Sequence, residues 1–259
     1  MEQFLERGIK SIIDQFPAVG DLLSEYDIGC VPCEVGTCLL KDIVEIHDLS
    51  PDDEYDLMVR MAKIVLPGRE VIIARRQRER PDTESGPKYS PPLKQLVYEH
   101  RWIQRFLALA PRIVADLDLD DERVRKRIAD SLHFIRVYAD AFHHAKEEEI
   151  LFARFDGKLE ILQVMLADHD RARAHVKAVD EAVQQRDGGG VRENLEAYRT
   201  LLADHITRED DILYPWMDRN LSDNQVGVLY REFAAVDSRF AKETKECEAF
   251  ILALENELT

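Results

Sequence analysis

Long amphipathic segments that follow one another with only short breaks are the feature that most constrains how this chain can fold. Apolar residues at helical spacing predict helices over about 92–116, 121–155, 158–186, 191–220 and 222–257. Consecutive helices joined by short loops lie antiparallel to each other. The sequence therefore predicts an all-α protein built on an up-down-up-down four-helix bundle. The extra C-terminal helix is either a fifth element of this bundle or a dimerisation helix.

The first third of the chain has a different character. Residues 1–66 are predicted to form a small helical domain that contains cysteines. Residues 67–91 combine a basic helix end with a segment rich in Pro, Ser and Gly, which is typical of an exposed linker. We therefore predict a bundle over 92–220 after this linker and a C-terminal helix over 221–259. We also expect the glycines at 188–190 to form a loop.

One pattern occurs twice in the predicted bundle. The segments 143–152 and 205–214 align without gaps, and both read His-x-x-basic-Glu-acid-acid-Ile-Leu-aromatic. A His and a Glu four residues apart lie on one face of a helix, where both side chains can reach one metal ion. Only the choice of His143 with Glu147 keeps the following Ile-Leu-aromatic residues in register with the second copy. We therefore treat His144, Glu148 and Glu149 as neighbours of the ligands.

The other two helices of the bundle each offer one acid-His pair in an apolar setting. These pairs are Glu99-His100 and Asp168-His169. Helix lengths place all four histidine positions at similar heights in the bundle. Six side chains are too many for one tetrahedral ion, but they suit two ions that share bridging carboxylates. The predicted metal ligands are His100, His143, Glu147, His169, His205 and Glu209.

Mixed imidazole and carboxylate ligands favour iron, with manganese or zinc as alternatives by ligand type. We therefore expect two iron ions in a centre of the Fe–O–Fe type. The Glu-x-x-His signature of ferritin-type di-iron proteins does not occur in the sequence. Tyr198 and Gln104 are further candidates to point towards the metals, with ordinary packing or exposure as the alternative. We expect His175 to lie outside the site.

These motifs make residues 92–220 resemble a hemerythrin-like, or HHE cation-binding, domain. Oxygen-carrying hemerythrins have a further His four residues after the one on the third helix, and here that position is Arg173. The chain is therefore more similar to the di-iron proteins that repair iron centres. That resemblance implies a response to nitric oxide and oxidative stress.

The N-terminal region resembles the small helical cysteine domain that precedes such bundles. It carries Cys30 and Cys33, spaced C-x-x-C, with Cys38 after them. One interpretation is a redox pair or a second metal site, and the alternative is buried, inert thiols. We expect Cys247, which is remote from the others, to be inert.

Two functions follow from these motifs and from the resemblance. The first is a di-iron protein that binds or reduces nitric oxide, oxygen or peroxide, with an electron donor or an iron-sulfur client protein as partner. The second is a metal or oxygen sensor that signals through the N-terminal domain or the last helix without turnover, and a homodimer would fit either function. The net charge of −16 disfavours nucleic acid and anionic membranes as partners. The N-terminal segment lacks signal-peptide features, so we expect a cytoplasmic protein.

Overall fold

The computed structural model describes residues 2–26, 28, 39–41, 43, 49, 51–69, 73 and 89–258. Over these residues the backbone is helical, and the β-type pairing is limited to an isolated bridge between Gly8 and Leu39. This result confirms the predicted all-α class. Contacts divide the chain into two compact units, one of residues 1–93 with 218–231 and the other of residues 94–217 with 232–259. The four-part domain division remains a prediction.

The first unit contains short helices around a small apolar core. These helices are α1 (Glu2–Leu5), α2 (Ile9–Gln15), α3 (Ala18–Ser24) and α5 (Pro51–Val65). Pro51 suits the first turn of α5 because its ring fixes a helical φ where no amide hydrogen bond is needed. Ile12, Leu23 and Leu57 are fully buried in this core. Cys30, Cys33 and Cys38 lie outside the described residues, so their predicted role is not addressed by the structure.

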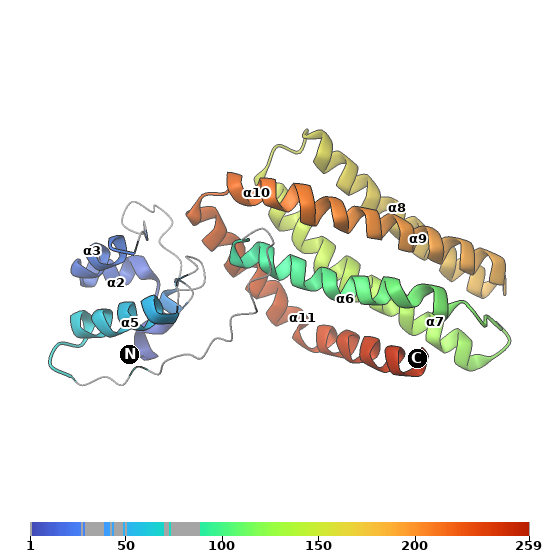
Figure 1. Ribbon diagram of the computed structural model, residues 1–259, viewed down its shortest axis with the longest axis horizontal. Helices are drawn as coiled ribbons and strands as arrows, with labels where there is room; N and C mark the ends of the chain where they lie inside the picture. Colours follow the sequence, from blue (N-terminus) through green and yellow to red (C-terminus); the bar gives the residue numbers. More distant parts are fainter. Residues whose placement is uncertain are drawn as a thin grey trace. The chain divides into compact units, whose positions relative to one another are not determined.

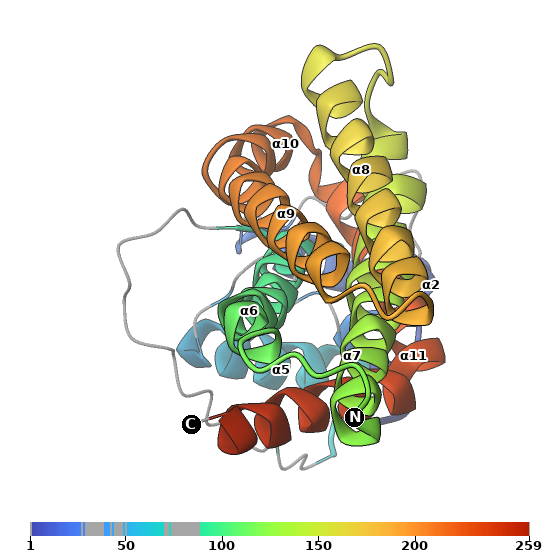
Figure 2. The ribbon, with the colours of Figure 1, turned by 90° about the vertical axis from the view of Figure 1, so that its right-hand side faces the viewer.

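The second unit is the predicted bundle, whose main helices run side by side in Figures 1 and 2. They are α6 (Pro91–Ile113), α7 (Glu122–Phe134), α8 (Glu160–Gln184) and α9 (Gly188–Arg208). The C-terminal helix α11 (Asp223–Leu258) contributes Cys247, Ile251 and Leu254 to the same apolar core. The last part of α11 is therefore a fifth element of this unit.

Two of the bundle helices continue into π-helical segments that overlap the repeated pattern. After α7 the chain continues as two π-helical segments, η1 (Ile135–His144) and η2 (Glu147–Leu151), and a 3₁₀ turn, η3 (Phe152–Arg154). After α9 comes a third π-helical segment, η4 (Glu209–Leu213), followed by α10 (Tyr214–Asn220). The amide of Phe152 donates to the Glu147 carbonyl, and that of Tyr214 to the Glu209 carbonyl. Both bonds span five residues, so each copy of the repeat contains a widened turn.

The three glycines expected to form a loop instead begin α9. Asp187 precedes them as the N-cap, and its carboxylate accepts a hydrogen bond of 3.0 Å from the Gly190 amide. The chain reverses one residue earlier, at Arg186, which has a positive φ of 56°. The prediction was wrong here because a capping aspartate compensates for the low helix propensity of glycine in the first turn.

Among the described residues, none of the helices combines the length and the apolar character needed to cross a membrane.

Candidate metal centre

Two groups of buried side chains meet inside the bundle, and each group could hold one metal ion. The first group contains His100, His143, Glu147 and Glu209. The second group contains His144, Glu147, His169 and His205. Within each group the candidate ligand atoms lie within 4.8 Å of one another, and every member is at most 3% exposed. Glu147 belongs to both groups, so the two positions are adjacent.

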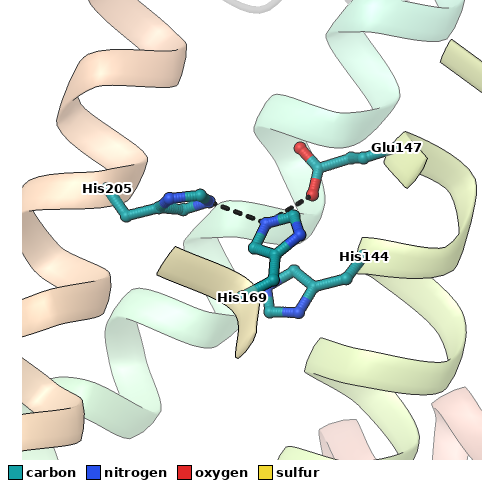
Figure 3. A group of neighbouring side chains, drawn as sticks. All are labelled: His144, Glu147, His169 and His205. Atoms are coloured by element: carbon teal, nitrogen blue, oxygen red, sulfur yellow. Dashed lines mark hydrogen bonds and ion pairs between the residues drawn. The ribbon is translucent and has the colours of Figure 1, made fainter. Parts of the chain in front are cut away.

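In the second group, the imidazole of His169 lies at the centre (Figure 3). Its Nε2 atom is 2.9 Å from Nε2 of His205 and 3.6 Å from Oε2 of Glu147. The ring of His144 stacks on the ring of His169, with centroids 3.9 Å apart. Three imidazoles and one carboxylate from η1, η2, α8 and α9 thus surround one point.

In the first group, two histidines face two carboxylates. His100 Nε2 lies 3.3 Å from Oε2 of Glu209, and His143 Nε2 lies 3.6 Å from Oε2 of Glu147. The other oxygen of Glu209 is 3.2 Å from Nε2 of His205, in the second group. Glu147 and Glu209 therefore both lie between the two sets of imidazoles, which is the position of bridging ligands.

Each of these five histidines has a carboxylate next to its Nδ1 atom. The pairs are His100–Asp210 at 2.8 Å, His143–Glu99 at 2.9 Å, His169–Glu148 at 2.7 Å, His205–Asp168 at 3.5 Å and His144–Asp140 at 3.6 Å. A carboxylate that accepts from Nδ1–H fixes the tautomer and leaves Nε2 free to bind a metal. His100, His143 and His169 lie at this hydrogen-bonding distance, whereas Nδ1 of His144 and of His205 lies near its carboxylate without a hydrogen bond.

Without metal ions, protonated histidines supply the positive charge in the centre. Burial disfavours the charged form of His100, but its hydrogen bond to Asp210 and the nearby carboxylate of Glu209 outweigh burial and raise its pKa to about 10. Burial also acts against a charged His205, yet the neighbouring Glu209 and Asp168 raise its pKa to about 9. The carboxylates around His100 and His205 therefore outweigh desolvation, whereas burial lowers the pKa of His143 and His144 well below its ordinary value.

The pKa values of Glu147 and Glu209 shift in opposite directions. Burial and the nearby Glu209 raise the pKa of Glu147 well above its ordinary value. Burial opposes ionisation of Glu209 too, but His205 and His100 lower its pKa well below the ordinary value. The Tyr214 hydroxyl donates a hydrogen bond to Glu147. Carboxylates bind metal ions in their ionised form, so metal binding would favour the charged form of Glu147.

Unpaired buried atoms test whether these residues fit metal ions. His143 Nε2, Glu147 Oε2 and both carboxylate oxygens of Glu209 have no hydrogen-bond partner within the described part of the chain. An unpaired buried polar atom costs about 1–3 kcal/mol. Two ligand atoms that bind the same ion, each at about 2.1 Å, lie up to about 4.2 Å apart. The separations between the candidate ligand atoms are close to that value. The residues therefore fit two metal ions.

A buried lysine lies behind the first group. Lys146 is fully buried and donates to Glu99 and, at 2.9 Å, to Oδ1 of Asp237 on α11. Burial raises the pKa of Glu99 to about 7, against the opposing effect of Lys146. Because Glu99 also accepts from His143, a continuous chain of charged groups joins α11 to a candidate ligand.

The structure brings together all six predicted ligands and adds His144, which the sequence pattern placed among their neighbours. Gln104 is exposed and does not reach the centre. Tyr198 is buried, and His175 lies outside both groups, where its Nδ1 is 3.1 Å from Oδ1 of Asn194. Tyr214 was not predicted from the sequence. It occupies the aromatic position of the second repeat, and a tyrosine at that position is the sequence feature that could have identified it as part of the site.

Comparison with known proteins agrees with this geometry. Three relatives are each 26% identical over 167 residues: the uncharacterized proteins Rv1995 and MT2051 of Mycobacterium tuberculosis and Mb2018 of Mycobacterium bovis. The match covers 60% of this chain and spans 63% of the length of each relative. No solved structure matches the chain. Residues 92–217 match the model of the hemerythrin HHE cation binding domain, and the two buried groups of side chains that could hold metal ions lie within this segment.

Proposed function

We propose that this protein is a non-haem di-iron protein that binds or reduces nitric oxide, oxygen or peroxide, in a stress response or in the repair of iron-sulfur centres. The observation that carries the proposal is the position of Glu147 and Glu209 between two sets of imidazoles. Two carboxylates that both face two groups of nitrogen ligands suit a pair of cations held side by side.

The residues of the chain have distinct roles in this proposal. Glu147 and Glu209 would hold both ions, and the histidines of the two groups would hold them through their Nε2 atoms. A ferrous pair with an open position supplies two electrons and a site for a small ligand. The Tyr214 hydroxyl holds a proton beside Glu147, and its ring stacks on His100 at 5.5 Å between centroids. Burial of the whole set limits access of water.

Metal analysis tests the proposal. The anaerobically purified protein should contain about two iron ions per chain, and its Mössbauer spectrum should show a coupled pair. His143→Ala and Glu209→Ala should each lower the iron content sharply. The matched controls are His133→Ala and Glu149→Ala, which change exposed residues close to the ligands in sequence. Full iron loading in both ligand variants would refute the assignment.

A sensor is the second candidate, and the connection between α11 and His143 favours it. Glu99 and Asp237 both pair with the buried Lys146, and Glu99 also contacts His143, so a change at the metal centre would alter a contact of α11. Stopped-flow mixing of the reduced protein with nitric oxide separates the two functions. Repeated turnover supports an oxidoreductase with an electron donor. Stoichiometric binding with a change in α11 supports a sensor.

A further inference from the structure

Arg173 on α8 lies behind the second ligand group and contacts carboxylates of the neighbouring π-helical segments. Its Nη2 donates to Oε1 of Glu148 at 2.6 Å, and its Nε donates to Oδ1 of Asp140 at 2.8 Å. Asp140 belongs to η1 and Glu148 to η2, so one guanidinium group joins the two segments. The remaining nitrogen, Nη1, donates to Asp170 on α8 itself at 3.2 Å. All three nitrogens of Arg173 are therefore engaged.

The two carboxylate oxygens that Arg173 contacts on η1 and η2 also face candidate metal ligands. Oε1 of Glu148 lies 2.7 Å from Nδ1 of His169. Oδ1 of Asp140 lies 3.6 Å from Nδ1 of His144. Each carboxylate therefore lies between Arg173 and an imidazole of the second group. A carboxylate in this position controls how the ring is oriented towards a metal ion.

The two imidazoles are also in contact with each other. The rings of His144 and His169 stack, with centroids 3.9 Å apart and an angle of 14° between their planes (Figure 3). Because the rings touch, the orientation of one restricts the orientation of the other. Holding both rings requires both carboxylates to be held. A guanidinium group suits this task, because its donors have a fixed planar arrangement that can reach two carboxylates at once.

The first ligand group is supported by a different cation. Lys146 donates to Glu99, which in turn lies 2.9 Å from Nδ1 of His143. Among the described residues, the acidic partners of Arg173 are Asp140, Glu148 and Asp170. None of these three acids lies behind a histidine of the first group. Arg173 therefore acts on one of the two metal positions.

We propose that Arg173 is a positioning residue for the second metal position. Through its two carboxylate partners it fixes the orientation of His144 and His169, and it does not bind an ion itself. The inference rests on the proposed function for the pair of ions, whereas the orientation of the rings depends only on the chain. Loss of Arg173 should therefore weaken the binding of one ion and leave the other in place.

Zinc is the probe for this experiment, because Zn²⁺ accepts imidazole and carboxylate ligands and is diamagnetic. Equilibrium dialysis of the wild-type protein should give two bound zinc ions per chain. Arg173→Met should leave the first ion bound as tightly as before and weaken the second about 10-fold, the lower end of the range for residues that orient metal ligands. With one zinc ion bound to this variant, NMR should show shifted ring nitrogens for His100 and His143, and unshifted ones for His169.

NMR of the metal-free chain tests the positioning role without any ion. The Nδ1 proton of His169, which Glu148 accepts, should exchange slowly with water in the wild-type protein and faster in Arg173→Met. The urea midpoint of the metal-free variant should stay close to that of the wild type. The reason is that the Arg173 side chain is 37% exposed, and ion pairs of exposed side chains contribute little to stability.

The matched control is Arg136→Met. Arg136 on η1 pairs with Asp180 on α8 at 2.8 Å, away from both ligand groups, and its loss should change neither zinc binding nor the exchange of the His169 proton. Arg173→Lys should recover only part of the lost zinc affinity, because one ammonium group lacks the planar arrangement of donors. This variant also replaces Arg173→Met if the latter fails to fold. Full recovery would show that charge alone acts and would overturn the positioning role.

These measurements separate the inference from the proposed function. If the wild-type protein holds no iron, but the exchange of the His169 proton responds to the loss of Arg173, the di-iron function fails and the positioning role is supported. If the wild-type protein holds two iron ions, but proton exchange and zinc binding are unchanged in Arg173→Met, the inference is overturned and the di-iron proposal is unaffected.

Discussion

Removal of the buried ammonium group of Lys146 should destabilise the bundle strongly. Lys146 is fully buried, pairs with Glu99 and Asp237, and lies 3.8 Å above the ring of Phe142. The substitution Lys146→Met preserves much of the apolar stem and removes the charge. Glu99 then remains buried, at 3% exposure, without its cation, whereas Asp237, with a side chain 37% exposed, can be solvated.

The expected loss follows from the state of Glu99. Breaking a buried ion pair by removing one partner costs about 3–5 kcal/mol. The pKa of Glu99 is about 7 even with Lys146 present, so without it the carboxyl group takes up a proton at neutral pH. Protonation limits the penalty, and we expect a loss of about 3 kcal/mol in the free energy of unfolding, at the lower end of that range.

Urea denaturation of the metal-free protein at pH 7 measures this loss. Both tryptophans, Trp102 and Trp216, belong to the bundle unit, so their fluorescence reports its unfolding. The matched control is Lys126→Met, whose side chain is 73% exposed and pairs with Asp130. An exposed pair of this kind contributes at most about 1 kcal/mol.

A double variant tests the reasoning directly. Lys146→Met combined with Glu99→Gln removes the stranded carboxyl group, so its total loss should be smaller than the sum of the two single losses. A loss below about 1 kcal/mol in the free energy of unfolding for Lys146→Met, or strict additivity in the double variant, would refute the claim that the Lys146–Glu99 ion pair stabilises the bundle as a buried pair does.

Three further predictions concern separate features. Asp168→Asn, behind His205, should lower metal affinity about 10–100-fold in a metal titration, whereas Asp170→Asn on the exposed side of α8 should not. Asp187→Ala should lower the free energy of unfolding by about 1 kcal/mol in urea, because α9 loses its N-cap; no measurable change would contradict the capping role. Burial raises the pKa of Cys247 to about 11, so at pH 8.5 iodoacetamide should modify this thiol only after denaturation, as mapped by mass spectrometry. Rapid modification of the folded chain would show that the thiol is accessible.

The sequence predicted most of the candidate ligands because their signal is local. His143 with Glu147, and His205 with Glu209, follow from spacing within one helix. Residues that act across helices leave no such signal. The contacts of Lys146 with Asp237 on α11 join positions 91 residues apart, and nothing in either segment predicts them.

His144 was missed for a different reason. The register of the repeated pattern selects His143 and leaves His144 as a neighbour, and on a regular α-helix adjacent residues point in clearly different directions. The π-helical backbone of η1 has more residues in each turn, which reduces the angle between neighbours. Both imidazoles can then face the interior. A widened turn depends on packing along the whole helix, and spacing rules based on regular helices do not predict it.

The widened turns have a consequence for the chain before it binds metal. π-helical hydrogen bonding is rare in proteins, and here it occurs at 135–144, 147–151 and 209–213, next to the residues that would hold the ions. Backbone amides there should exchange with solvent sooner than those of α8, which has a regular pitch. A cation bound by residues on both sides of each widened turn would hold the least stable segments of these helices in place. Metal binding and the completion of folding would therefore be coupled.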